Sequence, residues 1–354
     1  MIRSRTMSTR WIVLRERSQL HWGGDLRRHY ILSALASRAD AMDVDGWSLP
    51  AIRKATASVR HWPGTRRPRI AAATMLAPEA LEAIRGKAEP AAVDFHDDPI
   101  LQNSTLEIEP DPGWLDKVQV RKRANLETFR TLIAPSIELA ELAELPLDKV
   151  VVAGNGTDPR VIRAMPFPAT PAIGIMSGAA AGRGIETLIA ACRLVRSDLP
   201  AVRLVLWLAA TGSASEAYLA ALKQATAADR WIEYASAPYA EMSEHISGVT
   251  VQCVPNPRAG YWDAVAPIKL FDAMASGRPV VVTPRVVMRA EVERHHAGLV
   301  ASGDGPEDLA EPLARLLNDE ALAQRLGANG RAAAESTFDW NVIAASLASR
   351  LAES

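Results

Sequence analysis

The segment from Tyr261 to Thr283, YWDAVAPIKLFDAMASGRPVVVT, sets the tightest limit on how this chain can fold. Pro267 stands at a position typical of a helix start, an apolar stripe follows at helical spacing, and Gly277 ends the helix. The β-branched run at 280–282 comes directly afterwards and predicts a buried parallel strand. A helix that leads into such a strand indicates an α/β domain.

Two charged side chains lie on one side of this predicted helix, close to its start. Lys269 and Asp272 are three residues apart. Free backbone N–H groups at a helix N-terminus favour an anion, and Lys269 adds a positive charge. Asp272 can accept two hydrogen bonds from a vicinal diol such as ribose. The pattern favours a nucleoside diphosphate site, and the alternative is an amphipathic helix with a surface Lys–Asp pair.

The segment resembles the donor-binding motif of the retaining GT-B glycosyltransferases of family four, in the form P-x-K-L-F-E-Y-M-A-x-G-x-P-V-V. Asp272 stands at the family's Glu. The family's earlier acidic residue falls on Ala264, and Asp263 is the neighbouring carboxylate that can replace it. The resemblance implies a GT-B fold of two Rossmann-like α/β domains facing across a cleft. It also implies transfer of a sugar from a nucleoside-diphosphate sugar to an acceptor hydroxyl, with retention of anomeric configuration and without a divalent metal.

Strand, loop and helix patterns recur along the chain in two series, the first from Trp11 and the second from Ala172. Prolines at 159, 166, 168 and 171 indicate a linker between them. We therefore predict an N-terminal acceptor-binding domain over 1–165 and a C-terminal nucleotide-sugar-binding domain over 166–335. By the resemblance, 336–354 forms a helix that packs back on the first domain.

Glycines mark two predicted loops at the ends of strands. Gly23 and Gly24 follow the first strand and, by the resemblance, face the donor phosphates and the acceptor. In the second domain, Arg183 follows Gly182 at the start of a helix, a geometry suited to binding phosphate oxygens. This loop resembles the family's K-G element with Arg for Lys, and Ser177 stands where a second basic residue is common. Neither a dinucleotide-binding glycine motif nor a P-loop occurs.

His96 is the histidine with the most suggestive surroundings, because it follows a predicted strand and precedes Asp97 and Asp98. The resemblance places a histidine of this region against the transferred sugar or its phosphate. The alternative is a structural loop histidine paired with Asp97 or Asp98. No further ligand cluster follows, so no metal site is predicted. The predicted catalytic residues are His96, Arg183 and Lys269, with Gly23, Gly24, Gly182, Asp263 and Asp272 as substrate-binding residues.

Composition limits the partners of the protein. The formal net charge of −1 gives no general attraction to nucleic acid, and none is expected as a partner. Residues 1–70 nevertheless hold 14 Lys and Arg against 5 Asp and Glu, which leaves open a contact with lipid headgroups or an anionic acceptor. Those arginines include Arg27, Arg28, Arg60, Arg66, Arg67 and Arg69, and such runs are usually a solvated face.

The remaining features favour a cytoplasmic protein. The two cysteines, Cys192 and Cys253, lie far apart in apolar contexts and are expected to be reduced. The basic N-terminus has no signal-peptide pattern, and no apolar run is long enough to span a membrane.

Beyond the nucleotide sugar and its acceptor, which is a small molecule, a glycan or a lipid-linked sugar, no cofactor is expected. Two alternatives remain: a sugar-nucleotide epimerase of the same fold, and a non-catalytic scaffold that binds a nucleotide sugar.

Overall fold

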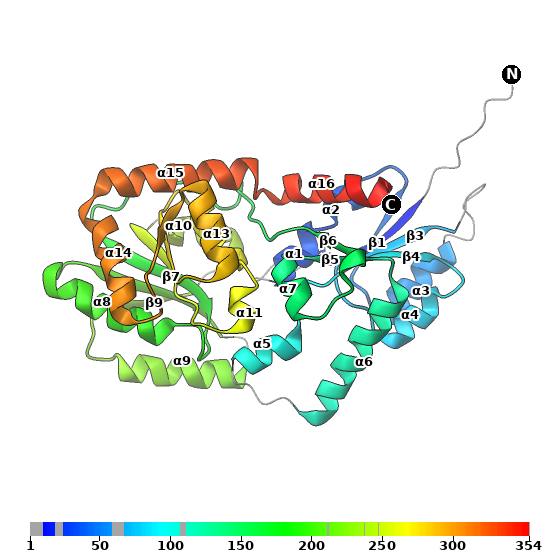
Figure 1. Cartoon of the computed structure of the whole chain (residues 1–354), viewed down its shortest axis with the longest axis horizontal. Helices are drawn as coiled ribbons and strands as arrows, with labels where there is room; N and C mark the ends of the chain where they lie inside the picture. The colour runs from blue at the N-terminus through cyan, green and yellow to red at the C-terminus, as the bar shows by residue number, and fades with distance from the viewer. Residues whose placement is uncertain are drawn as a thin grey trace, which may run out of the picture. The chain divides into compact units, whose positions relative to one another are not determined.

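The computed structural model describes residues 10–17, 24–58, 67–106, 111–210, 212–236, 238–246 and 248–353. The chain divides into two compact units (Figure 1). Unit 1 comprises residues 1–100, 110–154 and 340–354, and unit 2 comprises residues 101–109 and 155–339. The main crossing from unit 1 to unit 2 therefore follows Gly154, eleven residues before the boundary expected from the prolines.

Unit 1 is built on a six-stranded parallel sheet in the order β2-β1-β3-β4-β5-β6. Its strands are β1 (Trp11–Arg15), β2 (Ala41–Asp45), β3 (Arg69–Ala72), β4 (Glu89–Asp94), β5 (Thr131–Ala134) and β6 (Val150–Val152). β1, β3, β4 and β5 are almost wholly buried, as expected for parallel strands covered by helices on both faces.

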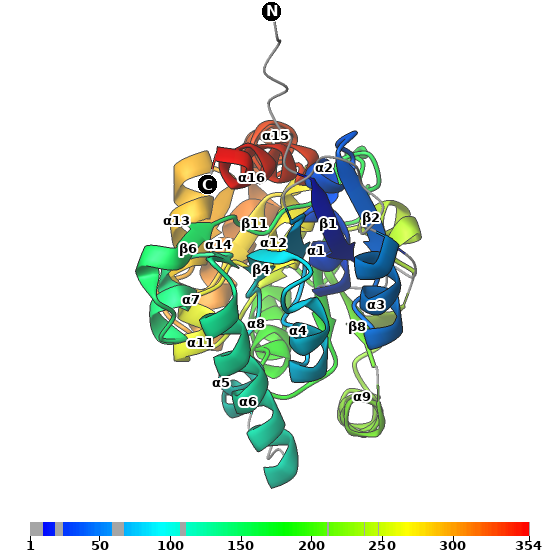
Figure 2. The same cartoon turned by 90° about the vertical axis from the view of Figure 1, so that its right-hand side faces the viewer.

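The helices of unit 1 include one from the far end of the chain. They are α1 (Gly24–Tyr30), α2 (Ser33–Ala36), α3 (Leu49–Ser58), α4 (Pro78–Ile84), α6 (Pro112–Thr128), α7 (Ile137–Leu142), the 3-10 turn η2 (Leu147–Lys149) and α16 (Trp340–Glu353), while α5 (Pro99–Thr105) bridges the division between units. The Trp340 ring of α16 is buried and stacks on Tyr30 at 5.9 Å between centroids. Figure 2 shows α6 extending away from the sheet, and Asn125 is the one residue of this helix that is buried.

Unit 2 repeats the architecture with the strand order β12-β11-β10-β7-β8-β9, again all parallel. Its strands are β7 (Ala172–Gly178), β8 (Arg203–Ala209), β9 (Ile232–Ala235), β10 (Val251–Val254), β11 (Val280–Val282) and β12 (Gly298–Val300). The chain runs outward from β7 through β8 to β9, then returns to the other side of β7 to form β10. The order of the sheet thus reverses between β7 and β10.

Helices cover this second sheet. They are α8 (Ile185–Asp198), α9 (Ser213–Ala225), η3 (Tyr239–Glu241), α10 (Met242–Ile246), α11 (Gly260–Asp263), α12 (Ile268–Ala275), α13 (Val286–His295), α14 (Pro306–Asn318) and α15 (Glu320–Ser336). α8 and α14 pack together, and their leucine and isoleucine side chains join those of the strands in one buried core. The predicted helix and strand at 267–283 are confirmed as α12 and β11, and the predicted α/β class is confirmed in both units.

Candidate functional site

Two of the predicted site residues, Arg183 and Lys269, lie where the order of the second sheet reverses. Arg183 is in the turn between β7 and α8, and Lys269 is in the first turn of α12, which follows β10. β7 and β10 are hydrogen-bonded neighbours. In open parallel sheets, ligands bind beyond the carboxyl ends of the two strands at such a reversal. The fold therefore brings both cations to the position where a ligand is expected.

Trp262 holds the turn that carries Arg183. Its Nε1 donates a hydrogen bond to the Gly182 carbonyl oxygen at 3.2 Å. The Arg183 guanidinium lies over the Trp262 ring, 5.5 Å from the centroid, and a cation in that position is attracted by the ring. Sequence reasoning missed Trp262, which lies in α11 and whose one signal was an aromatic residue shortly before α12.

The same turn requires two glycines in the left-handed region. Gly182 and Gly184 have φ values of 73° and 74°. A Cβ atom on Gly184 would lie 1.8 Å from the Pro255 carbonyl oxygen, so the β7–α8 turn packs directly on the segment after β10. A Cβ atom on Gly182 would lie 3.2 Å from the Thr105 carbonyl oxygen. These contacts fix the backbone on both sides of Arg183.

Lys269 is partnered by a neutral side chain rather than a carboxylate. Its Nζ donates to Oδ1 of Asn256 at 3.2 Å. Burial, and after it the positive charge of Arg183, lowers the pKa of Lys269 to about 7. A bound anion would relieve both effects because it offsets the desolvation and the repulsion between the cations.

Two further polar groups at this edge lack a partner. The Ser177 Oγ, near the end of β7, and the Asn256 Nδ2 are buried and have no hydrogen-bond partner among the described residues. Buried donors are seldom left unpaired in native proteins unless a water, an ion or a ligand completes them. Together with Arg183 and Lys269 they form a cradle suited to a phosphate.

Asp272 does not form the surface pair with Lys269 that the sequence left open. The side chain is buried, and its Oδ1 accepts hydrogen bonds from Thr157 Oγ1 at 2.7 Å and from Tyr239 OH at 3.1 Å. The pKa of Asp272 is raised to about 7. Burial is the main cause and the charge of Asp158 a smaller one, while the two hydrogen bonds act in the opposite direction. The described residues donate no hydrogen bond to Oδ2, so one oxygen remains for a ligand.

Asp263 belongs to an ion-pair cluster that sequence reasoning missed. Its Oδ1 lies 3.4 Å from Nη1 of Arg285, and Nη2 of Arg285 donates to Oδ1 of Asp304 at 2.6 Å. Arg285 is buried and follows the end of β11. The position after a strand end was the one sequence signal for it. Ala264 is buried beside this cluster.

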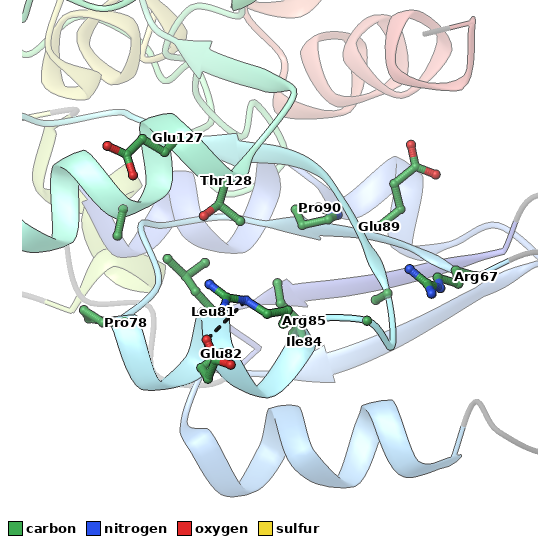
Figure 3. A pocket seen from close by; sticks show the side chains of 13 residues that line it. Arg67, Pro78, Leu81, Glu82, Ile84, Arg85, Glu89, Pro90, Glu127 and Thr128 are labelled. Carbon is green, nitrogen blue, oxygen red and sulfur yellow. Dashed lines mark ion pairs between the residues drawn. The ribbon is translucent and has the colours of Figure 1, made fainter.

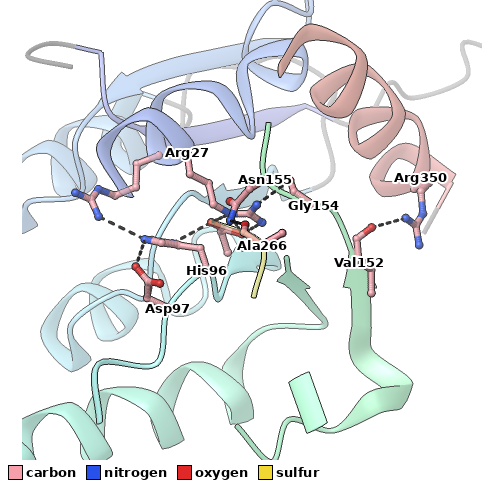
Figure 4. Close-up of polar contacts among 10 residues, drawn as sticks. Arg27, His96, Asp97, Val152, Gly154, Asn155, Ala266 and Arg350 are labelled. Carbon is pink, nitrogen blue, oxygen red and sulfur yellow. Dashed lines mark hydrogen bonds and ion pairs between the residues drawn. The ribbon is translucent and has the colours of Figure 1, made fainter. Parts of the chain in front are cut away.

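His96 lies in unit 1, in the loop after β4. Its Nδ1 is 3.0 Å from Oδ2 of Asp94, and its Nε2 is 3.7 Å from Oδ2 of Asp97 (Figure 4). Asp98, the other expected partner, instead accepts from Ile100 N and pairs with Lys122.

The glycine and arginine predictions for unit 1 have mixed outcomes. Gly24 begins α1 just beyond β1, the strand at which the first sheet reverses its order. Gly23, Arg60 and Arg66 lie outside the described residues. The interpretation of Arg27 as part of a solvated basic face is wrong, because its side chain is 1% exposed and pairs with Asp94.

The described residues also line an open pocket of about 730 Å³ in unit 1, between α4 and α6 (Figure 3). Glu89 at the first position of β4 and Arg67 before β3 contribute to its wall, so it lies at the amino edge of the sheet. None of the predicted site residues lines it. Ligands of parallel sheets bind at the opposite edge, so we do not assign this pocket to the site.

Within the described residues, no group of three or more His, Cys, Asp and Glu side chains is placed to hold a metal ion. The same residues include no helix with the length and hydropathy needed to cross a membrane.

Residues 170–319 match the protein family described as glycosyl transferases group 1. No curated protein sequence matches the chain. Among solved structures, sucrose-phosphate synthase from Thermosynechococcus elongatus is similar over 98% of this chain and 99% of its own, with 15% identity and a TM-score of 0.72. HepE of Anabaena, in complex with UDP and glucose, is similar over 98% and 100%, with 18% identity and a TM-score of 0.72.

A third structure matches less of its own length. TarM of S. aureus is similar over 81% of this chain and 55% of its own, with 14% identity and a TM-score of 0.61. At these identities the similarities show the fold, and the predicted GT-B fold is confirmed.

Proposed function

Because residues 170–319 match the group 1 glycosyl transferases, we propose that the protein moves a sugar from a nucleoside-diphosphate sugar to an acceptor hydroxyl. The observation that carries the proposal is the pair of cations, Arg183 and Lys269, at the reversal point of the second sheet. Negative charge grows on the diphosphate as its bond to the sugar breaks. Fixed positive charges and buried donors aimed at that group stabilise the transition state.

Each predicted residue receives a role in this proposal. Arg183 and Lys269 bind the diphosphate, with the Ser177 hydroxyl and the Asn256 amide as further donors. Asp272 accepts the ribose hydroxyls through Oδ2. In unit 1, His96 contacts the transferred sugar. The backbone at Gly182, and at Gly24 with its neighbour Gly23, approaches the phosphates, and Asp263 contacts the sugar at the rim of the Arg285 cluster.

A uridine nucleotide is the first donor to test. The HepE structures hold UDP, UDP with glucose, or UDP-glucose, and the TarM structure holds UDP with α-GlcNAc-glycerol and Fondaparinux. These ligands are those proteins' own, and they suggest a UDP-sugar donor for this chain. The acceptor is a small molecule, a glycan or a lipid-linked sugar.

We extend the proposal to retention of anomeric configuration by a front-face route that uses no divalent metal. The cationic side chains named above supply the charge that a metal would otherwise bring. Turnover is expected to survive excess EDTA. Loss of turnover in EDTA that Mn²⁺ or Mg²⁺ restores would contradict this part and direct attention to Asp97 and Asp98.

We also place the reaction in the cytoplasm, with a contact between the basic N-terminal part of unit 1 and anionic lipid. Cys192 and Cys253 are free and buried, which suits a reducing compartment. Co-sedimentation with anionic vesicles tests the lipid contact, and equal sedimentation with neutral vesicles would contradict it.

The proposal is tested first by binding and then by turnover. UDP, GDP and ADP are added separately, and the true diphosphate ligand at about 100 times its Kd is expected to stabilise the protein by about 2.7 kcal/mol. The matching sugar nucleotide is then incubated with acceptors, and NMR of the product gives its anomeric configuration. An isomerised donor without acceptor would indicate an epimerase. Binding without turnover of any donor would indicate a scaffold, and either result would overturn the proposal.

A further inference from the structure

A buried arginine and aspartate stand directly behind His96. Arg27 and Asp94 are 1% exposed or less, and their side chains meet in two parallel contacts of 2.9 and 2.8 Å. Nη1 of Arg27 also donates to the Gly154 carbonyl oxygen at 3.0 Å. Burial opposes the charge of Asp94, but the Arg27 guanidinium and His96 hold the pKa of that carboxyl below its usual range. Asp94 is therefore ionised and fixed in place.

The two nitrogens of the His96 ring face opposite chemistry. Nδ1 lies 3.0 Å from Oδ2 of the Asp94 carboxylate, although the angle falls short of a regular hydrogen bond. An ionised carboxylate can only accept a hydrogen bond, so it favours a proton on Nδ1. Nε2 lies 3.5 Å from Nη1 of Arg28, and a guanidinium can only donate. Of the two neutral tautomers, both neighbours thus favour the one with its proton on Nδ1 and its lone pair on Nε2.

The other charged groups around the ring do not reverse this preference. Asp97 Oδ2 is 3.7 Å from Nε2, beyond hydrogen-bonding distance. Arg28 is held by its ion pair with Asp25 and lies 5.6 Å from the centroid of the Trp47 ring. The Arg28 guanidinium, which faces Nε2, is therefore itself held in place by Asp25 and Trp47.

We propose that Asp94 and Arg27 are positioning residues that keep His96 protonated on Nδ1, so that Nε2 accepts a hydrogen bond from a sugar hydroxyl of the substrate. The inference rests on the proposed function for the identity of that hydroxyl, but the tautomer itself is a property of the free protein. The sequence groups Arg27 with the arginines of a basic surface, but its side chain is buried and takes this interior role instead.

The tautomer can be measured without any substrate. The full chain is labelled with ¹⁵N-histidine, and the signals of His96 are those lost in His96→Asn. In mildly alkaline solution, the Nε2 resonance is expected to be that of an unprotonated nitrogen and the Nδ1 resonance that of an N–H group. A ring protonated on Nε2, or an equal mixture, would overturn the inference.

The role of the pair is tested by replacing it as a unit. Asp94→Asn alone would leave the Arg27 charge buried without a partner, and that variant can fail to fold. The double variant Arg27→Met with Asp94→Leu substitutes apolar side chains of similar volume for the ion pair, an exchange that proteins often tolerate. The matched control is Arg15→Met with Asp43→Leu, a second bidentate pair in the same sheet that does not contact His96.

The double variant is expected to lose the Nδ1–H preference and up to about tenfold in sugar transfer, since one aligned hydrogen bond is worth up to that factor. The control pair is expected to change neither. Folding of both is followed by circular dichroism. An unchanged tautomer or an unchanged transfer rate in the folded double variant would overturn the inference while leaving the proposed function intact. Absence of transfer in the wild type would overturn the proposed function, and the NMR measurement would still decide the positioning.

Substitution of His96 itself gives a second test. Gln can place its amide oxygen near the position of Nε2, whereas Asn reaches only the position of Nδ1. His96→Gln is therefore expected to retain more transfer activity than His96→Asn. Equal or reversed activities would contradict the assignment of Nε2 as the acceptor.

Discussion

Lys269 is the side chain whose surroundings say most about its role. Its hydrogen-bond partner is the neutral Asn256, and burial together with the positive charge of Arg183 lowers its pKa to about 7. Such an arrangement is unfavourable for an empty protein and favourable for one that holds an anion. The free-energy cost of burying Lys269 close to a second cation therefore supports the proposal that a ligand with at least one negative charge binds here.

Replacing either cation is expected to weaken binding of a nucleoside diphosphate. A hydrogen bond to a charged group is worth about 1.5–3 kcal/mol, so Arg183→Ala and Lys269→Ala should each raise the Kd for UDP at least about tenfold in calorimetry. Arg183→Lys should retain part of the affinity, because it keeps the charge and loses the bidentate fork. Uridine, which lacks phosphates, should bind each variant as it binds the wild type.

Arg193→Ala is the control, because Arg193 lies on α8 in the same unit and pairs with Asp229 at the surface. Unchanged UDP affinity in both Arg183→Ala and Lys269→Ala would contradict the phosphate cradle.

The raised pKa of Asp272 predicts that the stability of unit 2 depends on pH. Burial raises the pKa of Asp272 from 3.8, the value for an exposed aspartate, to about 7 in the folded state, so between these values the folded state holds a proton that the unfolded state has released. The stability of unit 2 should then fall as pH rises through this window and level off above about 7. From pH 5 to pH 8 the loss is about 3 kcal/mol. Asp272→Asn, which can still accept from Thr157 and Tyr239, should lose this dependence in urea unfolding.

The same variant separates a structural from a binding role. If Oδ2 accepts the ribose hydroxyls, Asp272→Asn should weaken binding of UDP more than that of 2′-deoxy-UDP. An equal effect on the two nucleotides would contradict the ribose assignment, and a parallel pH profile in both proteins would contradict the raised pKa.

At the scale of elements, the β7–α8 turn is the part of the site with the least freedom. Gly184→Ala would put a Cβ atom 1.8 Å from the Pro255 oxygen at a φ of 74°. The strained φ alone costs about 1–2 kcal/mol, and the collision adds to it by displacing the segment that carries Asn256. We expect unit 2 to lose at least about 2 kcal/mol of stability and UDP affinity to fall at least about tenfold.

Gly46→Ala is the matched control for that variant. Gly46 has a φ of 73° with no atom within 4 Å of the added Cβ, so this variant carries the strain without the collision. If both variants behaved alike in stability and in UDP binding, the close approach of the turn to Pro255 would have no functional importance.

Sequence reasoning succeeded where the residues involved lie close together along the chain and failed where they lie far apart. Lys269, Asp272 and the strand after them share a short stretch, so helical spacing and β-branching predicted their structure. The partners of Asp272 could not be found in this way, because Thr157 is 115 residues away and Tyr239 is 33. Arg27 likewise looked like a solvated cation until the sheet brought Asp94 beside it, 67 residues along the chain.

Two features of the fold, the switch point of the second sheet and the boundary between the units, could not be read from the sequence. The switch point itself cannot be deduced from the order of strands along the chain, because it depends on which side of β7 receives β10. The prolines at 159–171 suggested a late domain boundary, yet Arg331 binds the carbonyl oxygens of Pro159 and Ile162 and holds that segment within unit 2.

At the scale of the whole molecule, the two units are expected to unfold as separate transitions. Trp340 is fully buried in unit 1, where it stacks on Tyr30. Trp340→Ala should lower the stability of unit 1 by about 3–5 kcal/mol and leave unit 2 unchanged in calorimetry. Added UDP should raise the transition of unit 2 more than that of unit 1, because most of the proposed UDP contacts are in unit 2.

Trp207→Ala, in β8, is the reciprocal control, because Trp207 is buried in unit 2. A single transition that moves equally in both variants would contradict the independence of the units.

The distribution of unit 1 along the chain has a consequence for synthesis on the ribosome. Residues 155–339 of unit 2 are contiguous, whereas unit 1 waits for α16, whose Arg350 binds the Val152 carbonyl oxygen and whose Leu351 binds Arg69. The unit that is started first is therefore finished last. Until α16 leaves the exit tunnel, the nascent chain exposes the apolar surface of unit 1 that Trp340 and Leu351 later cover. We expect a chaperone to bind that surface during this interval.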